Sequence, residues 1–499
     1  MVSTVAYEEL QQRFQRLSRI EHAMSYLSWD QMVMMPPGGM QGRADAMAEL
    51  AGMHHDLLTA SDMQSLFSDA LPGETEGADK NLKEMHRLWQ QETCLPAELV
   101  KARVVAGSRC EHGWRTQKAD NDWAGFLANF EEVVDLSREE ARLRQQAATD
   151  CPTPYDALLA VHCAGDTREL VDGVFDELRE KLPGLLKEVM TLQEKHKAKV
   201  PSGIFDTTKQ LEVNEALMRA LGFDFAAGRL DQSMHPFSMG SAGDLRITTR
   251  FREDEFLDAL MATAHETGHA SYESGLPQQW SGLPVGQHRN MCIHESQSLL
   301  FEKQIFLSLP FLEGFLPTIK EQFQQIDNSA SEIWNYATHV QPEFIRVEAN
   351  EVTYPLHVLL RYEIERSLIN GDIEAREIPE LWRAKMLDFM GLDVGDNHAI
   401  GCLQDIHWSD GTFGYFPSYT VGAVNAAQLF AAIKRDHPDW QDRFRRLDIG
   451  FIRDWLAERI WSKGRLLTSQ EIMQHASGEV TNSRYFLEHL QSRYLDRNY

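Results

Sequence analysis

The apolar residues of the first thirty positions recur at helical spacing. They follow one another at intervals of three to five residues, mostly three or four, which places them on one stripe of an α-helix: Val5, Leu10, Phe14, Leu17, Ile20, Met24 and Leu27. Two prolines and two glycines at 36–39 end this pattern, because neither residue type continues a helix readily. The opening of the chain therefore predicts one long amphipathic helix.

The same periodicity returns along most of the chain. Similar spacing occurs at 317–340 and at 353–370. A further helix, which Pro183 is expected to end or kink, has four leucine and valine side chains on one face: Leu170, Val174, Leu178 and Leu182. These repeated helical patterns predict a mainly α-helical protein.

Strand signals are few by comparison. The clearest is the alternating run at 245–250, and the segment around Ile204 and Phe205 is a second candidate. No internal repeat or low-complexity linker marks a domain boundary. We therefore expect a single domain over residues 1–499 with a small sheet beside the functional site. A separate N-terminal helical subdomain up to about residue 130 is also compatible with the pattern.

Charge and cysteine usage exclude several classes of function. With 49 basic and 75 acidic residues, the formal charge is −26, which opposes binding to nucleic acid or to anionic membranes. No apolar run is long enough to cross a bilayer, and the N-terminus lacks the pattern of a secretory signal. The six cysteines are scattered without a C-x-x-C pair, which is typical of reduced thiols. A cytoplasmic protein is expected.

The most informative motif is H-E-x-x-H at 265–269. Residues four apart lie on one face of a helix, so His265 and His269 can bind the same metal ion. Glu266 projects from a neighbouring part of the helix and can reach a water molecule without binding the metal itself. The alternative is a helix on which two histidines lie four apart by chance. A third ligand is needed to decide between the two interpretations.

Glu295 is the candidate for that third ligand. It lies 26 positions after His269, at the start of the next apolar-rich helical pattern. Two histidines and one carboxylate leave a fourth position open on zinc, as a catalytic site requires. A glutamate at the start of a helix can also simply complement the helix dipole. His294 would point elsewhere if Glu295 faces the metal, so it is not expected to be a ligand.

Several further motifs occur in a fixed order along most of the chain. They are Ser28-Trp29-Asp30, His235-Pro236-Phe237, Asp244-Leu245-Arg246-Ile247-Thr248, the metal motif, His294-Glu295-Ser296, Ile345-Arg346-Val347-Glu348-Ala349, and the segment from Gly401 to Trp408. Together they resemble the Taq carboxypeptidase-like family of zinc metallocarboxypeptidases, which is related to the angiotensin-converting enzyme and neurolysin group. One departure is Asn350, where the family pattern usually has an acidic residue.

The resemblance implies both a fold and a function. It implies a mostly helical protein with a deep groove, zinc on the floor of that groove, and commonly a homodimer. It also supports Glu295 as the third zinc ligand. The expected activity is the removal of single amino acids from peptide C-termini, with Glu266 as the general base that takes a proton from water and returns it to the leaving amine.

Other groups are expected to stabilise the developing oxyanion or to bind the peptide. In the related peptidases a histidine followed by tyrosines stabilises the oxyanion, which indicates His407 with Tyr415 or Tyr419. The alternative is that these aromatic residues only pack a core. Gln404 is expected to position His407 and the wall of the substrate groove.

A free C-terminal carboxylate is usually bound by arginine. Arg246 and Arg346 are the candidates, and Arg246 is preferred because its strand is expected to line the groove. The alternative for each is a structural ion pair. His235 either touches the peptide or caps a turn.

Two other functions remain open at this stage. A dipeptidyl carboxypeptidase or an oligoendopeptidase could use the same zinc core, and the closed end of the groove would distinguish them. A non-catalytic protein with structural zinc is disfavoured by the intact Glu266. The same ligands also accept cobalt or manganese in place of zinc.

Overall fold

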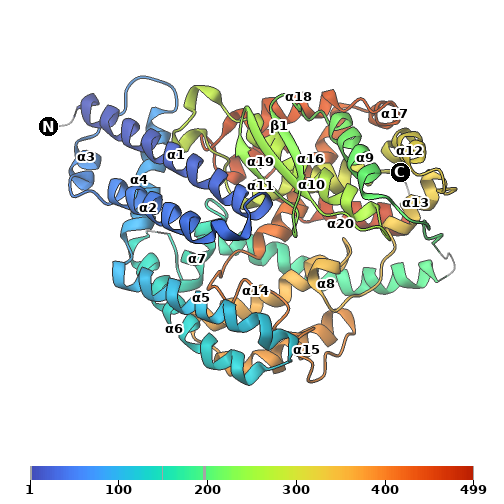
Figure 1. The fold of residues 1–499 in the computed structure, drawn as a ribbon, viewed down its shortest axis with the longest axis horizontal. Coiled ribbons are helices and arrows are strands. Elements are labelled where there is room, and N and C mark those ends of the chain that lie inside the picture. The colour runs from blue at the N-terminus through green and yellow to red at the C-terminus, as the bar shows by residue number, and fades with distance from the viewer. Residues whose placement is uncertain (1–2, 149, 195–197, 498–499) are drawn as a thin grey trace.

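Helices dominate the computed structural model, which describes residues 3–148, 150–194 and 198–497. These residues contain twenty α-helices and one three-stranded sheet (Figure 1), which confirms the expected fold class. The helices before the sheet are α1 Thr4–Val33, α2 Met40–Leu58, α3 Met63–Asp69, α4 Ala78–Thr93, α5 Ala97–Ala119, α6 Trp123–Ala147, α7 Pro154–His162, α8 Arg168–Gln193 and α9 Thr207–Ala220.

The remaining helices follow the sheet and carry most of the expected site residues. They are α10 Leu257–Ser274, α11 Met291–Leu299, α12 Leu309–Gln322, α13 Ala330–Ala337, α14 Tyr354–Asn370, α15 Ile378–Met390, α16 Pro417–Asp436, α17 Trp440–Arg445, α18 Gly450–Arg459, α19 Ser469–Ser477 and α20 Arg484–Leu490. A π-helical segment, η4 Leu300–Phe306, continues α11. None of the described helices is long and apolar enough to span a membrane.

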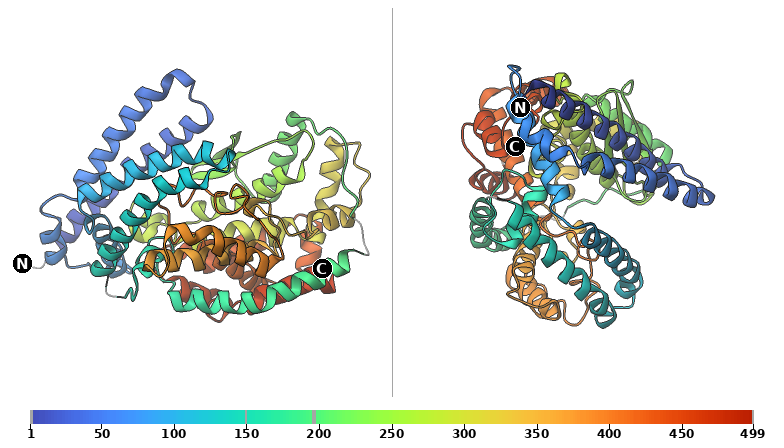
Figure 2. Two further views of the ribbon diagram at one scale, coloured as in Figure 1. Left: turned by 90° about the horizontal axis from the view of Figure 1, so that it is seen from below. Right: turned by 90° about the vertical axis from the view of Figure 1, so that its left-hand side faces the viewer.

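The N-terminal helices agree with the predicted amphipathic pattern. Helix α1 buries Leu10, Phe14 and Leu17 and packs against α2 and α3. Together with α4 and the segment 280–285, these residues form a small core of their own. The hairpin of α1 and α2 projects from one end of the molecule in the left view of Figure 2.

Two details of the sequence interpretation differ from the structure. Of the two effects expected of Pro183, the end of the helix does not occur, because Pro183 lies inside α8. The segment around Ile204 and Phe205 is not a strand; Phe205 is buried against other aromatic rings, so burial and not sheet pairing accounts for its apolar character.

The sheet contains one expected strand and two others. Strand β3 (Asp244–Thr249) lies between β1 (Gly228–Gln232), to which it is parallel, and β2 (Phe237–Ser241), to which it is antiparallel. Leu245 and Ile247 of β3 are buried in a small cluster with Ala270 of α10. Because side chains alternate along a strand, Arg246 faces the other side, toward α1.

Helices α11 and α16 lie between two large apolar cores. Cys292 of α11 belongs to one core and Ile293 to the other, and residues of α16 likewise contribute to both. Close approach of these helices depends on two glycines. A Cβ at Gly268 of α10 would lie 2.5 Å from a carbonyl oxygen of α11, and a Cβ at Gly422 of α16 would lie 2.7 Å from the Cβ of Glu295. The backbone that carries Glu295 is therefore tightly fixed.

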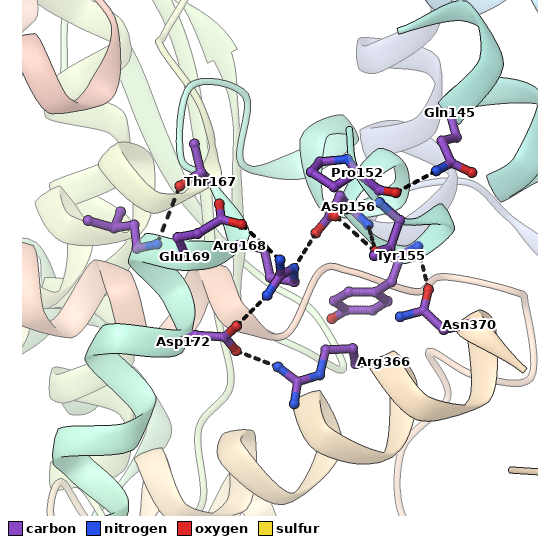
Figure 3. Close-up of polar contacts among 12 residues, drawn as sticks. Gln145, Pro152, Tyr155, Asp156, Thr167, Arg168, Glu169, Asp172, Arg366 and Asn370 are labelled. Carbon is purple, nitrogen blue, oxygen red and sulfur yellow. Dashed lines mark hydrogen bonds and ion pairs between the residues drawn. The ribbon is translucent and has the colours of Figure 1, made fainter. Parts of the chain in front are cut away.

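A polar network joins α7, α8 and α14 (Figure 3). Arg168 pairs with Asp156 at 3.1 Å and with Asp172 at 2.7 Å, and Asp172 also pairs with Arg366 at 2.5 Å. The side-chain oxygen of Asn370 accepts a hydrogen bond from the backbone N–H at the start of α7. The network fixes α14, whose first residue lines the site described below.

Candidate active site

Three side chains from two helices converge at the centre of the molecule. Helix α10 presents His265 and His269 one turn apart, and α11 brings Glu295 opposite them. The Nε2 atom of His265 lies 3.9 Å from Glu295, and Nε2 of His269 lies 3.5 Å from the other oxygen of the same carboxylate. The structure thus brings the three predicted metal ligands together.

These distances fit a metal site better than a hydrogen-bonded cluster. Hydrogen bonds of this kind span 2.7–3.2 Å. Zinc binds imidazole nitrogen and carboxylate oxygen at about 2.0–2.2 Å, so tetrahedral ligands lie roughly 3.3–3.6 Å from one another. The side chains are only 21%, 12% and 10% exposed, in the order His265, His269 and Glu295. The donor set and its spacing therefore fit a bound divalent cation.

The electrostatics of the three residues also favour a cation. Burial lowers the pKa of His265, but Glu295 and the hydrogen-bonded Glu302 outweigh burial and raise this pKa to about 9. Burial and the neighbouring His294 and His265 hold the pKa of His269 well below its usual value. The two glutamates therefore favour a positive charge at His265. His269 stays neutral, which is the form of histidine that binds a metal ion.

Glu266 lies beside this site without belonging to the ligand set. Its side chain is buried, and burial raises its pKa. The hydroxyl of Ser238, on the edge strand β2, donates a hydrogen bond to its carboxylate. A buried carboxylate with a raised pKa, next to a metal site, is suited to accept and return a proton.

Two cavities lie near the metal ligands, and the smaller one is lined by two of them. A groove of about 930 Å³ runs between α1, β2 and the α10–α11 pair, and its wall includes Ser238 and His294. A smaller cavity of about 200 Å³ is lined by His265, Glu295 and Tyr419, among others. A groove is thus present, and its wall reaches His294 next to Glu295, while His265 and Glu295 themselves line the smaller inner pocket.

The aromatic segment at 407–419 reaches this inner pocket at Tyr419. The rings of His407 and Tyr415 are 5.9 Å apart, and those of Tyr415 and Tyr419 are 5.3 Å apart. Burial lowers the pKa of His407 to about 4, so its imidazole is neutral at pH 7. Its Nδ1 atom is buried and has no hydrogen-bond partner within the described part of the chain. Burial, followed by the charge of Glu295, raises the pKa of Tyr415.

The two candidate arginines lie in different surroundings. Arg246 pairs with Asp244 at 2.6 Å and lies over the Trp29 ring at 4.7 Å, on the side of the sheet facing α1. Arg346 is buried, pairs with Asp405 at 2.8 Å and donates a hydrogen bond to the hydroxyl of Tyr354 at 2.5 Å. Because Tyr354 also lines the inner pocket, Arg346 is connected to the metal side of the site.

The remaining predicted residues have more peripheral positions. His235 is exposed in the turn between β1 and β2, where its backbone carbonyl accepts a hydrogen bond from the hydroxyl of Thr248. Gln404 is buried, accepts a hydrogen bond from the backbone N–H of Arg346 and donates to the carbonyl of Phe344. It therefore fixes the backbone that carries Arg346. Asn350 caps the turn before α14 by accepting backbone hydrogen bonds.

Sequence reasoning missed three residues that contact the site. Glu302 accepts a hydrogen bond from Nδ1 of His265 at 2.9 Å, Glu273 lies one turn after His269, and Tyr354 joins Arg346 to the inner pocket. The spacing of Glu273, four residues after His269 on the same helix, was a usable signal.

Comparisons with known proteins agree with this geometry. Residues 9–494 match the family model described as carboxypeptidase Taq (M32) metallopeptidase. Thermostable carboxypeptidase 1 of Thermus thermophilus is 34% identical over 99% of both chains, and carboxypeptidase 1 of Bacillus subtilis is 32% identical over 96% of this chain and 97% of its own. The solved structure of Trypanosoma cruzi metallocarboxypeptidase 1 superposes with a TM-score of 0.94 at 39% identity, over 99% of this chain and 100% of that one. The chain belongs to the carboxypeptidase Taq (M32) family of metallopeptidases, as its motifs predicted.

Proposed function

We propose that this metallocarboxypeptidase uses zinc to remove single amino acids from the C-termini of peptides, with His265, His269 and Glu295 as the ligands. The observation that carries the proposal is the spacing of these donors, which is too wide for hydrogen bonds and suited to a shared cation. When bound, such a cation polarises the scissile carbonyl and makes a neighbouring water more acidic.

Glu266 acts as the general base in this proposal. Its raised pKa allows its carboxylate to take a proton from the attacking water and to hold it. The protonated side chain then gives that proton to the leaving amine. Ser238 orients the carboxylate through its hydrogen bond, so β2 and α10 are joined at the reacting centre.

Neutral donors at the inner pocket stabilise the developing oxyanion. Tyr419 lines this pocket beside His265 and Glu295, and Tyr415 hydrogen-bonds to it. His407 is neutral at pH 7 and retains one buried nitrogen without a partner in the described chain. Hydrogen-bond donors held in a water-poor site are effective because they need no reorganisation during the reaction.

Arg346 provides the charge that recognises the peptide carboxylate. Two buried guanidinium groups, those of Arg346 and Arg361, share the single carboxylate of Asp405. One positive charge is therefore left over next to Tyr354, at the inner pocket. Arg246 is the alternative, but its guanidinium group already donates two hydrogen bonds to the carboxylate of Asp244, on the side of the sheet that faces α1. Gln404 supports Arg346, and His235 is proposed to meet the peptide at the groove rim.

The wider setting follows the same expectations. We propose one catalytic domain over residues 1–499, a homodimer in solution, a cytoplasmic location and peptides with a free C-terminus as substrates. The six cysteines are free thiols, in agreement with a reducing compartment. Cobalt or manganese can replace zinc, because the same ligands accept both.

The products of two matched peptides test the activity. One peptide has a free C-terminus and the other an amide, and each is incubated with the protein, with and without a chelator, before mass spectrometry. We expect a ladder of single-residue losses from the free peptide alone, and none with the chelator. Internal cuts in both peptides would favour an oligoendopeptidase, and loss of residue pairs a dipeptidyl carboxypeptidase.

The two arginines are separated by matched variants in the same assay. Arg346→Lys keeps a charge for Asp405 but loses the two-pronged geometry that binds a carboxylate. We expect kcat/KM on the free peptide to fall about 10- to 100-fold, since a charge-assisted hydrogen bond contributes about 1.5–3 kcal/mol. Arg246→Lys should change kcat/KM on the free peptide by less than about threefold. The reverse order would identify Arg246 as the carboxylate-binding residue.

A further inference from the structure

A second cluster of two histidines and one glutamate lies next to the metal ligands. Glu273, His288 and His294 place one potential ligand atom each within 4.8 Å of one another, as the metal ligands do. All three border the large groove. The cluster has the same chemical composition as the metal site, but no role in the proposed reaction has been assigned to it.

The distances within this cluster are those of hydrogen bonds. Nδ1 of His288 lies 2.8 Å from Oε1 of Glu273, and Nε2 of His294 lies 2.9 Å from the same oxygen. The corresponding distances between the histidines and Glu295 in the metal site are 3.5 and 3.9 Å. Hydrogen bonds therefore suffice to hold the second cluster together, whereas the wider distances in the metal site match those between the ligands of a metal ion.

The positions of the protons follow from the contact between His269 and His294. Their Nδ1 atoms are 2.5 Å apart, so one of the two must carry a proton and the other must not. When Nε2 of a neutral His269 binds the metal, the proton of its ring is on Nδ1. His269 is then the donor, and Nδ1 of His294 is the acceptor. The remaining proton of His294 is on Nε2 and is donated to Glu273.

This arrangement is incompatible with a second ion bound by a neutral His294. An ion on its Nε2 atom would move the ring proton to Nδ1, where it would face the proton of His269 across 2.5 Å. Burial opposes ionisation of Glu273, but the two imidazoles outweigh burial and hold its pKa well below the usual value. The carboxylate thus remains an acceptor at neutral pH.

We propose that His294 and Glu273 form a hydrogen-bonded relay that fixes His269 in the tautomer and orientation that bind the metal. His294, the first residue of the His294-Glu295-Ser296 motif, is therefore a positioning residue that acts through a ligand. Glu302 does the same for His265 by a direct hydrogen bond. Removing a hydrogen-bond partner of a metal-binding histidine typically weakens metal affinity by about 10- to 100-fold.

The inference rests on the metal site of the proposed function, and three substitutions at one position test it. The amide of asparagine can place an oxygen near the position of Nδ1, while that of glutamine reaches the position of Nε2. His294→Asn therefore restores an acceptor for His269, His294→Gln does not, and His294→Phe keeps a ring without nitrogen. Each purified protein is stripped of metal and titrated with Zn²⁺ against a competing chelator, and with Co²⁺ to record its visible spectrum.

We expect the Phe and Gln variants to bind Zn²⁺ 10- to 100-fold more weakly and to show an altered Co²⁺ spectrum. The Asn variant should stay within about threefold of the wild type with a similar spectrum. The metal-free variants should have the same Tm as the metal-free wild type within a few degrees. A purely structural role of His294 would instead lower the Tm of the variants. Equal affinities of the Asn and Gln variants, or wild-type affinity of the Phe variant, would overturn the relay.

Metal content separates this inference from the proposed function. One ion per wild-type chain, lost in His265→Ala, supports the metal site itself. Two ions per chain, one of them lost in Glu273→Gln, would show that the second cluster binds metal and would overturn the relay. A wild-type chain that binds no ion would overturn the proposed function as well.

Discussion

The two sides of the inner pocket carry opposite surplus charges. On one side, which we term the acidic cluster, Glu266, Glu295 and Glu302 surround the two histidines, and Lys303 pairs with Glu302. Three carboxylates thus face the ammonium group of Lys303 and the imidazole of His265. Although burial lowers the pKa of His265, Glu295 and Glu302 raise it to about 9, so one negative charge remains in excess. On the other side, which we term the basic cluster, Arg346 and Arg361 share Asp405.

Unbalanced buried charge is unfavourable unless a counter-ion arrives. A bound cation would therefore stabilise the acidic cluster, and a bound anion would stabilise the basic cluster. A divalent metal ion and the carboxylate of a peptide meet these two needs. The same kind of imbalance, with opposite sign, thus prepares the pocket for a cation on one side and for the carboxylate of a peptide on the other.

Substitution of Asp405 tests the basic cluster with the largest expected change in stability. Asp405→Asn removes the carboxylate between two buried guanidinium groups, so we expect the free energy of unfolding at pH 7 to fall by about 3–5 kcal/mol. Urea unfolding measures this change. Asp393→Asn is the control, because its ion pair with Arg383 is half exposed and should contribute little to stability.

The same variant has a defined pH dependence. Burial would raise the pKa of Asp405, but Arg361 and Arg346 outweigh burial and hold it well below the usual value. The unfolded chain therefore binds this proton more readily, and the stability from Asp405 is present above about pH 4 and lost as pH falls. As the pH falls below about 4, the wild type should lose stability more steeply than Asp405→Asn. Parallel curves would contradict this charge assignment.

Substitution of Glu302 tests the acidic cluster with a smaller effect. Burial opposes its ionisation, but Lys303 and His265 outweigh burial and lower its pKa to about 2. Glu302→Gln keeps an acceptor for His265 but removes one negative charge, so we expect Zn²⁺ affinity to fall about tenfold. Glu313→Gln, at an exposed ion pair on α12, should not change it. Unchanged affinity in Glu302→Gln would remove this carboxylate from the acidic cluster.

The sequence indicated those parts of the site that depend on local spacing. The four-residue interval of His265 and His269, the helical stripe of α1 and the alternating run of β3 were all recognisable from neighbouring residues. Glu295 was a candidate from its position at the start of the next helix, and the family motifs supported it. These features depend on contacts within one helix or one strand, where periodicity determines which side chains share a face.

Features that depend on distant contacts could not be predicted in the same way. Strand β2 has the sequence FSMGS without an alternating pattern, and it is a strand because it pairs with β3. Glu302 follows Glu295 by seven residues, but the intervening chain changes to a π-helix, so a regular helical register does not place it. The charge balance around Asp405 joins residues 346, 361 and 405, which only the folded chain brings together.

The most direct test of the account is the metal content and activity of Glu266→Gln, measured on the same preparation. Because Glu266 moves the proton but does not hold the ion, the variant should retain one metal ion per chain. Its kcat on a peptide with a free C-terminus should fall by about 10³-fold or more. Activity within tenfold of the wild type, or loss of the ion together with activity, would contradict the assignment of Glu266 as the general base beside a site formed by His265, His269 and Glu295.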